Sequence, residues 1–112
     1  MWQRAPRDHV QVLTWVDTSP DDGFSGPDLK ALVTQVTAEP GQSWVIDASG
    51  IASLSSESIA LLIGLVRSTN LAGGKMVLAG PVASVATVLR MTRLTRILPI
   101  HDDVEQAVTA LA

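Results

Sequence analysis

The chain has 112 residues, of which 46% are hydrophobic and 17% are charged, and its net charge is −3. This length is typical of one domain, and so high an apolar content argues against disorder. The absence of cysteine excludes disulfides and zinc sites built from cysteine. An acidic chain is also a poor match for a nucleic-acid-binding protein, which normally carries a basic stripe. We predict a single domain over residues 1–112 with no nucleic acid as partner.

The apolar segments are too short to anchor the chain in a membrane. The longest of them, Ile59 to Val66, is far shorter than the roughly 20 residues that a helix needs to cross a bilayer. The first eight residues lack the apolar stretch of a signal peptide. The sequence therefore predicts a cytoplasmic protein without membrane insertion.

The first half of the chain predicts strands separated by a loop and a helix. His9 to Val16 is rich in β-branched and aromatic residues, which favours a strand, and residues 1–8 are either a frayed lead or a short first strand. Turn-forming residues fill Thr18 to Pro27, and apolar residues at helical spacing predict a helix over Pro27–Thr37. Ser43–Ala48 lacks alternation, which predicts a strand buried on both faces.

The second half continues to alternate between helices and strands. In chain order, the patterns predict a helix over Ser56–Leu71 with a glycine C-cap at Gly73-Gly74, a strand over Lys75–Ala79, a helix starting at Gly80-Pro81, an edge strand over Ile97–Ile100 and a helix over Asp102–Ala112. The main buried faces are expected at Ile59, Leu62, Ile63 and Val66 and at Val82, Val85, Val88 and Leu89, with Ala60, Leu61 and Leu65 broadening the first. This order predicts an α/β domain: a mixed, mostly parallel β-sheet of four or five strands with about four α-helices.

Four serines lie where the Ser43–Ala48 strand gives way to the following helix: Ser53, Ser55, Ser56 and Ser58. A helix N-terminus carries free N–H groups and a partial positive charge, so these hydroxyls can cap the helix, accept a phosphate or contact a partner. Capping is the simplest interpretation. The capping-box pattern is nevertheless absent, because Leu54 stands three residues before Glu57.

No pattern in the sequence indicates catalysis, a metal site or a cofactor. The two histidines, His9 and His101, are far apart, and neither H-E-x-x-H nor G-x-S-x-G is present. Basic residues recur late in the chain, at Arg67, Lys75, Arg90, Arg93 and Arg96. A solvated helical face is the simpler explanation, and a patch for an anion or an acidic partner is the alternative. We predict that the protein is not an enzyme.

The segment order, together with D-A-S-G-I-A-S-L-S-S-E-S-I-A-L-L at residues 47–62, resembles the STAS domain family of bacterial anti-sigma factor antagonists. That family usually reads D-L-S-G-V-x-F-I-D-S-S-G-L-x-x-L, and the matching positions are Asp47, Ser49, Gly50, Ile51 and Leu54. The late stretch M-T-R-L-T-R-I-L-P-I-H-D-D-V-E-Q-A is similar to the family's L-x-G-L-x-R-x-F-P-I-x-x-S-x-E-E-A. The resemblance covers about residues 10 to 112 and implies a single STAS-like domain.

The resemblance also implies a role in bacterial signalling and transcription regulation. In the family, a serine in this turn is phosphorylated by an anti-sigma factor with a protein-serine kinase fold. The unphosphorylated antagonist binds that factor and frees the sigma factor. The alignment places the acceptor at Ser56, with Ser55 and Ser58 as second choices. The implied partner-binding residues are Asp22, Ser53, Ser55, Ser56, Glu57 and Ser58, together with the exposed side of the helix.

Departures from the family pattern at the aspartate and at two glycines leave other functions open. Ser55 stands at the family's aspartate, and Ser58 and Arg93 stand at two of its glycines. The alternatives are an accessory subunit of a lipid-transport ABC complex, a role of some small STAS proteins, and a diverged STAS protein with no phospho-switch. A small hydrolase is disfavoured by the lack of a placed His, Cys or metal set. Pairing of exposed strand edges leaves a homodimer open.

Overall fold

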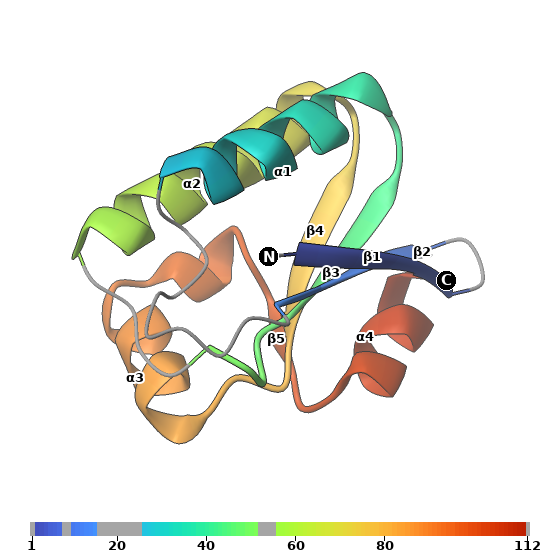
Figure 1. The fold of residues 1–112 in the computed structure, drawn as a ribbon. Helices are drawn as coiled ribbons and strands as arrows, with labels where there is room; N and C mark the ends of the chain where they lie inside the picture. Colours follow the sequence, from blue (N-terminus) through green and yellow to red (C-terminus); the bar gives the residue numbers. More distant parts are fainter. Residues whose placement is uncertain (1, 8–9, 16–25, 52–55, 112) are drawn as a thin grey trace.

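The computed structural model describes residues 2–7, 10–15, 26–51 and 56–111 of the chain. A five-stranded sheet carries helices on both faces (Figure 1). The elements in chain order are β1 (Trp2–Arg7), β2 (Val10–Trp15), α1 (Gly26–Ala38), β3 (Ser43–Asp47), α2 (Ser56–Leu71), β4 (Lys75–Ala79), α3 (Ala83–Met91), the 3-10 helix η1 (Leu94–Arg96), β5 (Ile100–His101) and α4 (Val104–Leu111). The predicted α/β class, with a mostly parallel sheet and four α-helices, is confirmed.

The strands lie side by side in the order β1-β2-β3-β4-β5; β1 is antiparallel to β2 and every other pair is parallel. Each connection, from β2 to β3, from β3 to β4 and from β4 to β5, leads to the neighbouring strand, always in the same direction across the sheet. Because such connections are almost always right-handed, α1, α2 and α3 cover one face of the sheet, while α4 covers the other (Figure 1). The order of the described strands never reverses, so this sheet lacks the crevice where doubly wound proteins bind ligands.

The central strand β3 is buried on both faces, as its continuous apolar pattern predicts. Trp44 and Ile46 contribute to the core beneath α1, α2 and α3, and Val45 contributes to the smaller core beneath α4. All three side chains are fully buried. β4 is divided in the same way: Met76 and Leu78 lie in the first core, and Val77 and Ala79 in the second. The sheet therefore separates two hydrophobic cores.

The helices bury faces close to those that the sequence predicts. In α2, Leu62, Leu65 and Val66 are buried, so Leu65, which we expected only to broaden the face, lies within the core. The expectation that Val82 belongs to the buried face of α3 is wrong. The helix begins at Ala83, and Val82 precedes it in an extended conformation and is 39% exposed.

Two predicted boundaries need correction. A strand over Ile97–Ile100 is wrong, because the chain forms η1 and then a turn in which Leu98 is buried; only Ile100–His101 pairs with β4. The final helix begins at Val104 rather than at Asp102, because Asp103 caps it by accepting a hydrogen bond from the Gln106 N–H at 2.8 Å. The expected edge position of the last strand is confirmed.

The first strand, one of two alternatives for residues 1–8, forms β1 and is attached to α1 through Arg4. The Arg4 guanidinium lies 4.9 Å from the centroid of the Trp44 ring, donates to Glu39 Oε1 at 2.6 Å and donates from Nε to Gln11 Oε1 at 2.8 Å. The hydrogen bond from Arg4 lowers the pKa of the Glu39 carboxyl. This cluster joins the edge strand to the residue that follows α1.

Candidate partner-binding surface

The turn after β3 holds the first residues of the family motif. The Asp47 carboxylate oxygen Oδ1 accepts hydrogen bonds from the Ser49 N–H at 3.1 Å and from the Ser49 hydroxyl at 2.7 Å. Such an aspartate-based turn, here followed by Gly50, reverses the direction of the chain. Ile51 is buried, and its N–H donates to the Ala48 carbonyl at 3.0 Å. These motif residues therefore fix the path by which the chain leaves the sheet.

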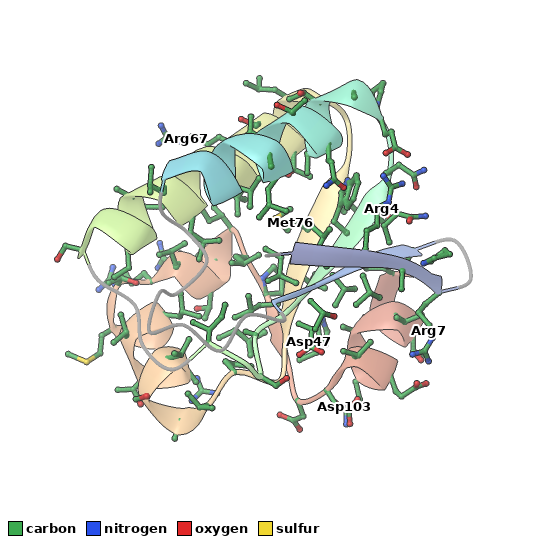
Figure 2. All side chains as sticks on the ribbon, in the orientation of Figure 1. Arg4, Arg7, Asp47, Arg67, Met76 and Asp103 are labelled. Carbon is green, nitrogen blue, oxygen red and sulfur yellow. The ribbon has the colours of Figure 1, made fainter. Side chains whose placement is uncertain are left out.

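The neighbouring strand ends support this turn. Gly80 follows β4 with φ +61°, and its N–H donates to the His101 carbonyl at 3.0 Å. A Cβ at Gly80 would lie 3.6 Å from the Asp102 carbonyl oxygen and 3.9 Å from Ser49 Cβ. In Figure 2, Asp47 and Asp103 lie at the same lower end of the sheet. The carboxyl ends of β3, β4 and β5 are therefore packed closely together beside the motif residues 47–51.

Ser56 is the first residue of α2, as the sequence predicts, and it is exposed. The N-terminal turn of a helix carries a partial positive charge, so a negative group is stabilised there. A phosphate on Ser56 would lie at the surface and would not require the core to open. The position therefore suits a modification that changes the surface and leaves the fold intact.

One face of α2 is exposed along its whole length, and it begins at Ser56. The exposed residues at helical spacing are Ser56, Ala60, Gly64, Arg67 and Leu71. Leu71 is 90% exposed, and Figure 2 shows Arg67 projecting away from the sheet. Gly64 has open space around it, since a Cβ there would meet no atom within 4 Å. A glycine inside a helix weakens it by about 1 kcal/mol. Internal packing does not explain why Gly64 stands at this position.

The structure describes only part of the predicted site. Asp22, Ser53 and Ser55 lie outside the described residues, as do the side chains of Glu57 and Ser58. The loop predicted over Thr18–Pro27 also lies outside them, apart from its last two residues, which begin α1. Gly64 and Gly80 are features of this surface that our sequence reasoning missed. Gly80-Pro81 was interpreted only as a helix start, although a glycine directly after a strand is itself a signal for an unusual turn.

The departure from the family pattern at Arg93 has a conformational consequence. Arg93 adopts φ 60° and ψ 21°, the left-handed region in which glycine has no steric penalty. Its N–H donates to the Arg90 carbonyl at 3.1 Å, which closes the end of α3. The family's glycine at this position therefore has a backbone explanation, and this chain adopts the same turn with an arginine.

The described residues show neither a membrane-spanning helix nor a metal site. No helix among them is both long enough and apolar enough to cross a bilayer. No three of their histidine, aspartate and glutamate side chains are placed to hold a metal ion together.

Comparison with known proteins identifies the family. The family model of the STAS domain matches residues 18–107, so the chain belongs to the STAS domain family, and the resemblance read from the sequence is confirmed. Among curated proteins, none matches this sequence.

Several solved structures share the fold. A STAS domain protein from Planctomyces limnophilus, an anti-sigma-factor antagonist, has a TM-score of 0.77 at 16% identity, covering 97% of this chain and 96% of that one. An anti-sigma factor antagonist from Mycobacterium paratuberculosis has a TM-score of 0.70 at 22% identity, covering 98% and 92%. A candidate anti-sigma factor antagonist from Thermotoga maritima has a TM-score of 0.74 at 22% identity, covering 97% and 92%. At these identities the likeness shows the fold alone.

Proposed function

We propose that this protein is an anti-sigma factor antagonist, a non-catalytic cytoplasmic module whose single STAS-like domain spans residues 1–112. It binds an anti-sigma factor with a protein-serine kinase fold and thereby frees a sigma factor. Membership of the family and the named roles of the structural neighbours support this proposal. The observation that carries it is the exposed Ser56 at the first position of α2, at the start of an exposed helical face.

Phosphorylation of Ser56 would end the binding by electrostatics. A phosphate adds about −1.5 to −2 charges, which the helix N-terminus itself tolerates. A partner seated over Ser56 would have to remove water from that charge or bring its own acids against it, and a buried like-charge contact costs several kcal/mol. A tenfold loss of affinity needs only about 1.4 kcal/mol. The switch therefore requires no change in the fold.

The proposed interface extends beyond Ser56. It includes Asp22, Ser53, Ser55, Glu57 and Ser58, which the family alignment assigns to the partner-binding turn and the preceding loop. It also includes the exposed face of α2. Ala60 has a small side chain and Gly64 has none, so a partner can approach the helix backbone closely at this face.

Affinity capture from the native host, followed by titration of the purified partner, tests the proposal. Wild-type protein should capture an ATP-binding kinase-like anti-sigma factor, and Ser56→Glu should weaken the binding at least tenfold. Thr109→Glu is the matched control, because it also introduces a carboxylate at an exposed hydroxyl-bearing residue. Thr109 lies on α4, which covers the other face of the sheet, so this variant should bind like wild type. Equal binding by Ser56→Glu and wild type would show that the switch is wrong.

A second candidate is an accessory subunit of a lipid-transport ABC complex, which would bind its transporter constitutively. The feature that favours it is Ser55, which stands where the family's phosphorylated turn carries an aspartate. In the same capture experiment, this function predicts a transporter ATPase held equally by wild type and by Ser56→Glu.

A further inference from the structure

A groove lies beside the amino end of β4, beyond the point where β5 stops covering that strand. Its volume is about 440 Å³. The lining includes Lys75, Met76, Arg96, Ile97, Pro99 and Leu111. Apolar side chains form much of this surface, and Ile97 is 43% exposed. The groove is open to solvent and lies at the opposite end of the sheet from Ser56.

The edge of β4 inside the groove is unpaired. β5 pairs only with Leu78 and Ala79, and the Leu78 N–H donates to the Pro99 carbonyl at 2.9 Å. Alternate residues of a strand direct their backbone groups to the same side, so the N–H and C=O of Met76 also face β5's side. Pro99 has no N–H to offer, and within the described residues no backbone hydrogen bond reaches Met76 from that side. A short stretch of sheet edge is therefore left free.

The groove is positively charged. Lys75 and Arg96 line it and are exposed, and neither forms an ion pair with any described residue. His101 also lines it, and none of the lining residues that the structure describes is acidic. An occupant of this groove should therefore be acidic.

We propose that the groove receives an extended acidic segment of a partner protein, which adds a strand to the free edge of β4. The backbone of the segment would pair with Met76, its apolar side chains would contact Ile97, and its carboxylates would lie against Lys75 and Arg96. Addition of a strand combines backbone hydrogen bonds with side-chain selectivity. A lipid tail cannot satisfy the backbone groups of Met76. A second copy paired edge to edge would bring the same cations against each other.

This inference does not depend on the proposed function. Ser56 and Asn70 are 14 residues apart on α2, which corresponds to about 21 Å along the helix. A segment in the groove can therefore bind whether or not Ser56 is modified. The two surfaces allow the domain to hold one partner at the groove while the Ser56 end responds to another.

Three labelled octapeptides test the proposal by fluorescence polarisation and by amide chemical shifts. One alternates Glu with Val, the second alternates Lys with Val, and the third is the Glu peptide with every backbone amide N-methylated. The Glu peptide should bind and shift the Met76 amide, and both other peptides should bind at least tenfold more weakly. The double variant Lys75→Glu/Arg96→Glu should raise the Kd for the Glu peptide at least tenfold. Arg90→Glu, an exposed change outside the groove, should alter it less than twofold.

Several results would overturn the proposal. Equal binding of the Glu and Lys peptides contradicts the role of charge, and equal binding of the N-methylated peptide contradicts strand addition. No binding of the Glu peptide by the wild-type chain, or chemical shifts confined to α1 and the start of α2, contradicts the site itself. Thermal melting of each variant confirms that a loss of binding is not a loss of fold. Because Ser56→Glu should leave peptide binding unchanged, failure here and failure of the phospho-switch are distinguishable.

Discussion

The two ends of the parallel sheet are built in different ways. At the amino end, the three helix-to-strand connections each contain a residue with positive φ: Gly41 at 81°, Gly73 at 77° and Arg93 at 60°. Backbone hydrogen bonds join the first two connections, including Gly41 N–H to the Ala72 carbonyl at 2.9 Å. At the carboxyl end, Gly80 also has a positive φ, but side-chain hydrogen bonds around Asp47 shape the turn after β3, and exposed Ser56 follows.

This difference indicates that the residues that determine stability and the residues proposed to bind the partner lie at opposite ends of the sheet. The amino-end connections have little freedom, because backbone atoms approach each other closely and particular φ values are required. The start of α2 has no such constraint on Ser56, whose side chain is exposed. Changes in the connections should therefore alter the free energy of unfolding, whereas changes at Ser56 should alter binding at nearly constant stability.

The largest effect is expected at Gly74, where a side chain would collide with backbone. A Cβ there would lie 2.4 Å from the Gln42 carbonyl oxygen, so Gly74→Ala should lower the free energy of unfolding by about 3 kcal/mol. Gly73→Ala is the control: it has open space but φ +77°, and should cost about 1 kcal/mol. Urea denaturation measures both. A smaller cost at Gly74 than at Gly73 would contradict this view of the amino end.

Arg93 offers a gain in stability at the third connection. Arg93→Gly should raise the free energy of unfolding by about 1 kcal/mol, because glycine adopts φ 60° without strain. The same substitution at Arg90, within α3 and also exposed, should lower it by about 1 kcal/mol. If both variants are destabilised in urea titrations, strain at Arg93 is not the reason for the family's glycine.

Gly64 lies between the two ends on the exposed face of α2. Gly64→Ala should stabilise the helix by about 0.5–1 kcal/mol, and Ala60→Gly should destabilise it by a similar amount. If this face contacts the partner, Gly64→Ala should also weaken partner binding although it strengthens the fold. Paired thermal melting and titration separate these effects. Unchanged binding would remove Gly64 from the interface.

The smallest effect concerns the ion pair between Arg4 and Glu39. The Glu39 pKa is lowered in the folded state by the hydrogen bond from Arg4, so its contribution to stability is present above the unfolded-state pKa. That contribution should disappear as the pH falls through the lowered value. Wild type should therefore exceed Glu39→Gln in urea midpoint near pH 7 and converge with it in acid. A difference that stays constant with pH would exclude this cause.

The apolar patterns predicted most of the fold, because helices and buried strands differ in spacing. The bounds of α2 were predicted at Ser56 and Leu71, since a hydroxyl side chain favours its start and Gly73 ends it. The run Ile97–Ile100 was misinterpreted as a strand, because a short apolar run does not distinguish a strand from a buried turn.

The candidate site could be predicted only in part. The position of Ser56 at the start of α2 follows from residue types. The conformation of Arg93 could not be read from the sequence, because arginine normally avoids positive φ. The free edge at Met76 depends on how far β5 extends along β4, which is set by the fold around Pro99.

The most direct test is to measure the affinity of the captured anti-sigma factor for this protein before and after stoichiometric phosphorylation of Ser56. Calorimetric titration with the two forms gives both values, and mass spectrometry confirms the modified residue. The account predicts that the unmodified protein binds and that the phosphorylated protein binds at least tenfold more weakly, with equal melting temperatures. Equal affinities would contradict the switch and would leave Ser56 as the ordinary first residue of a helix.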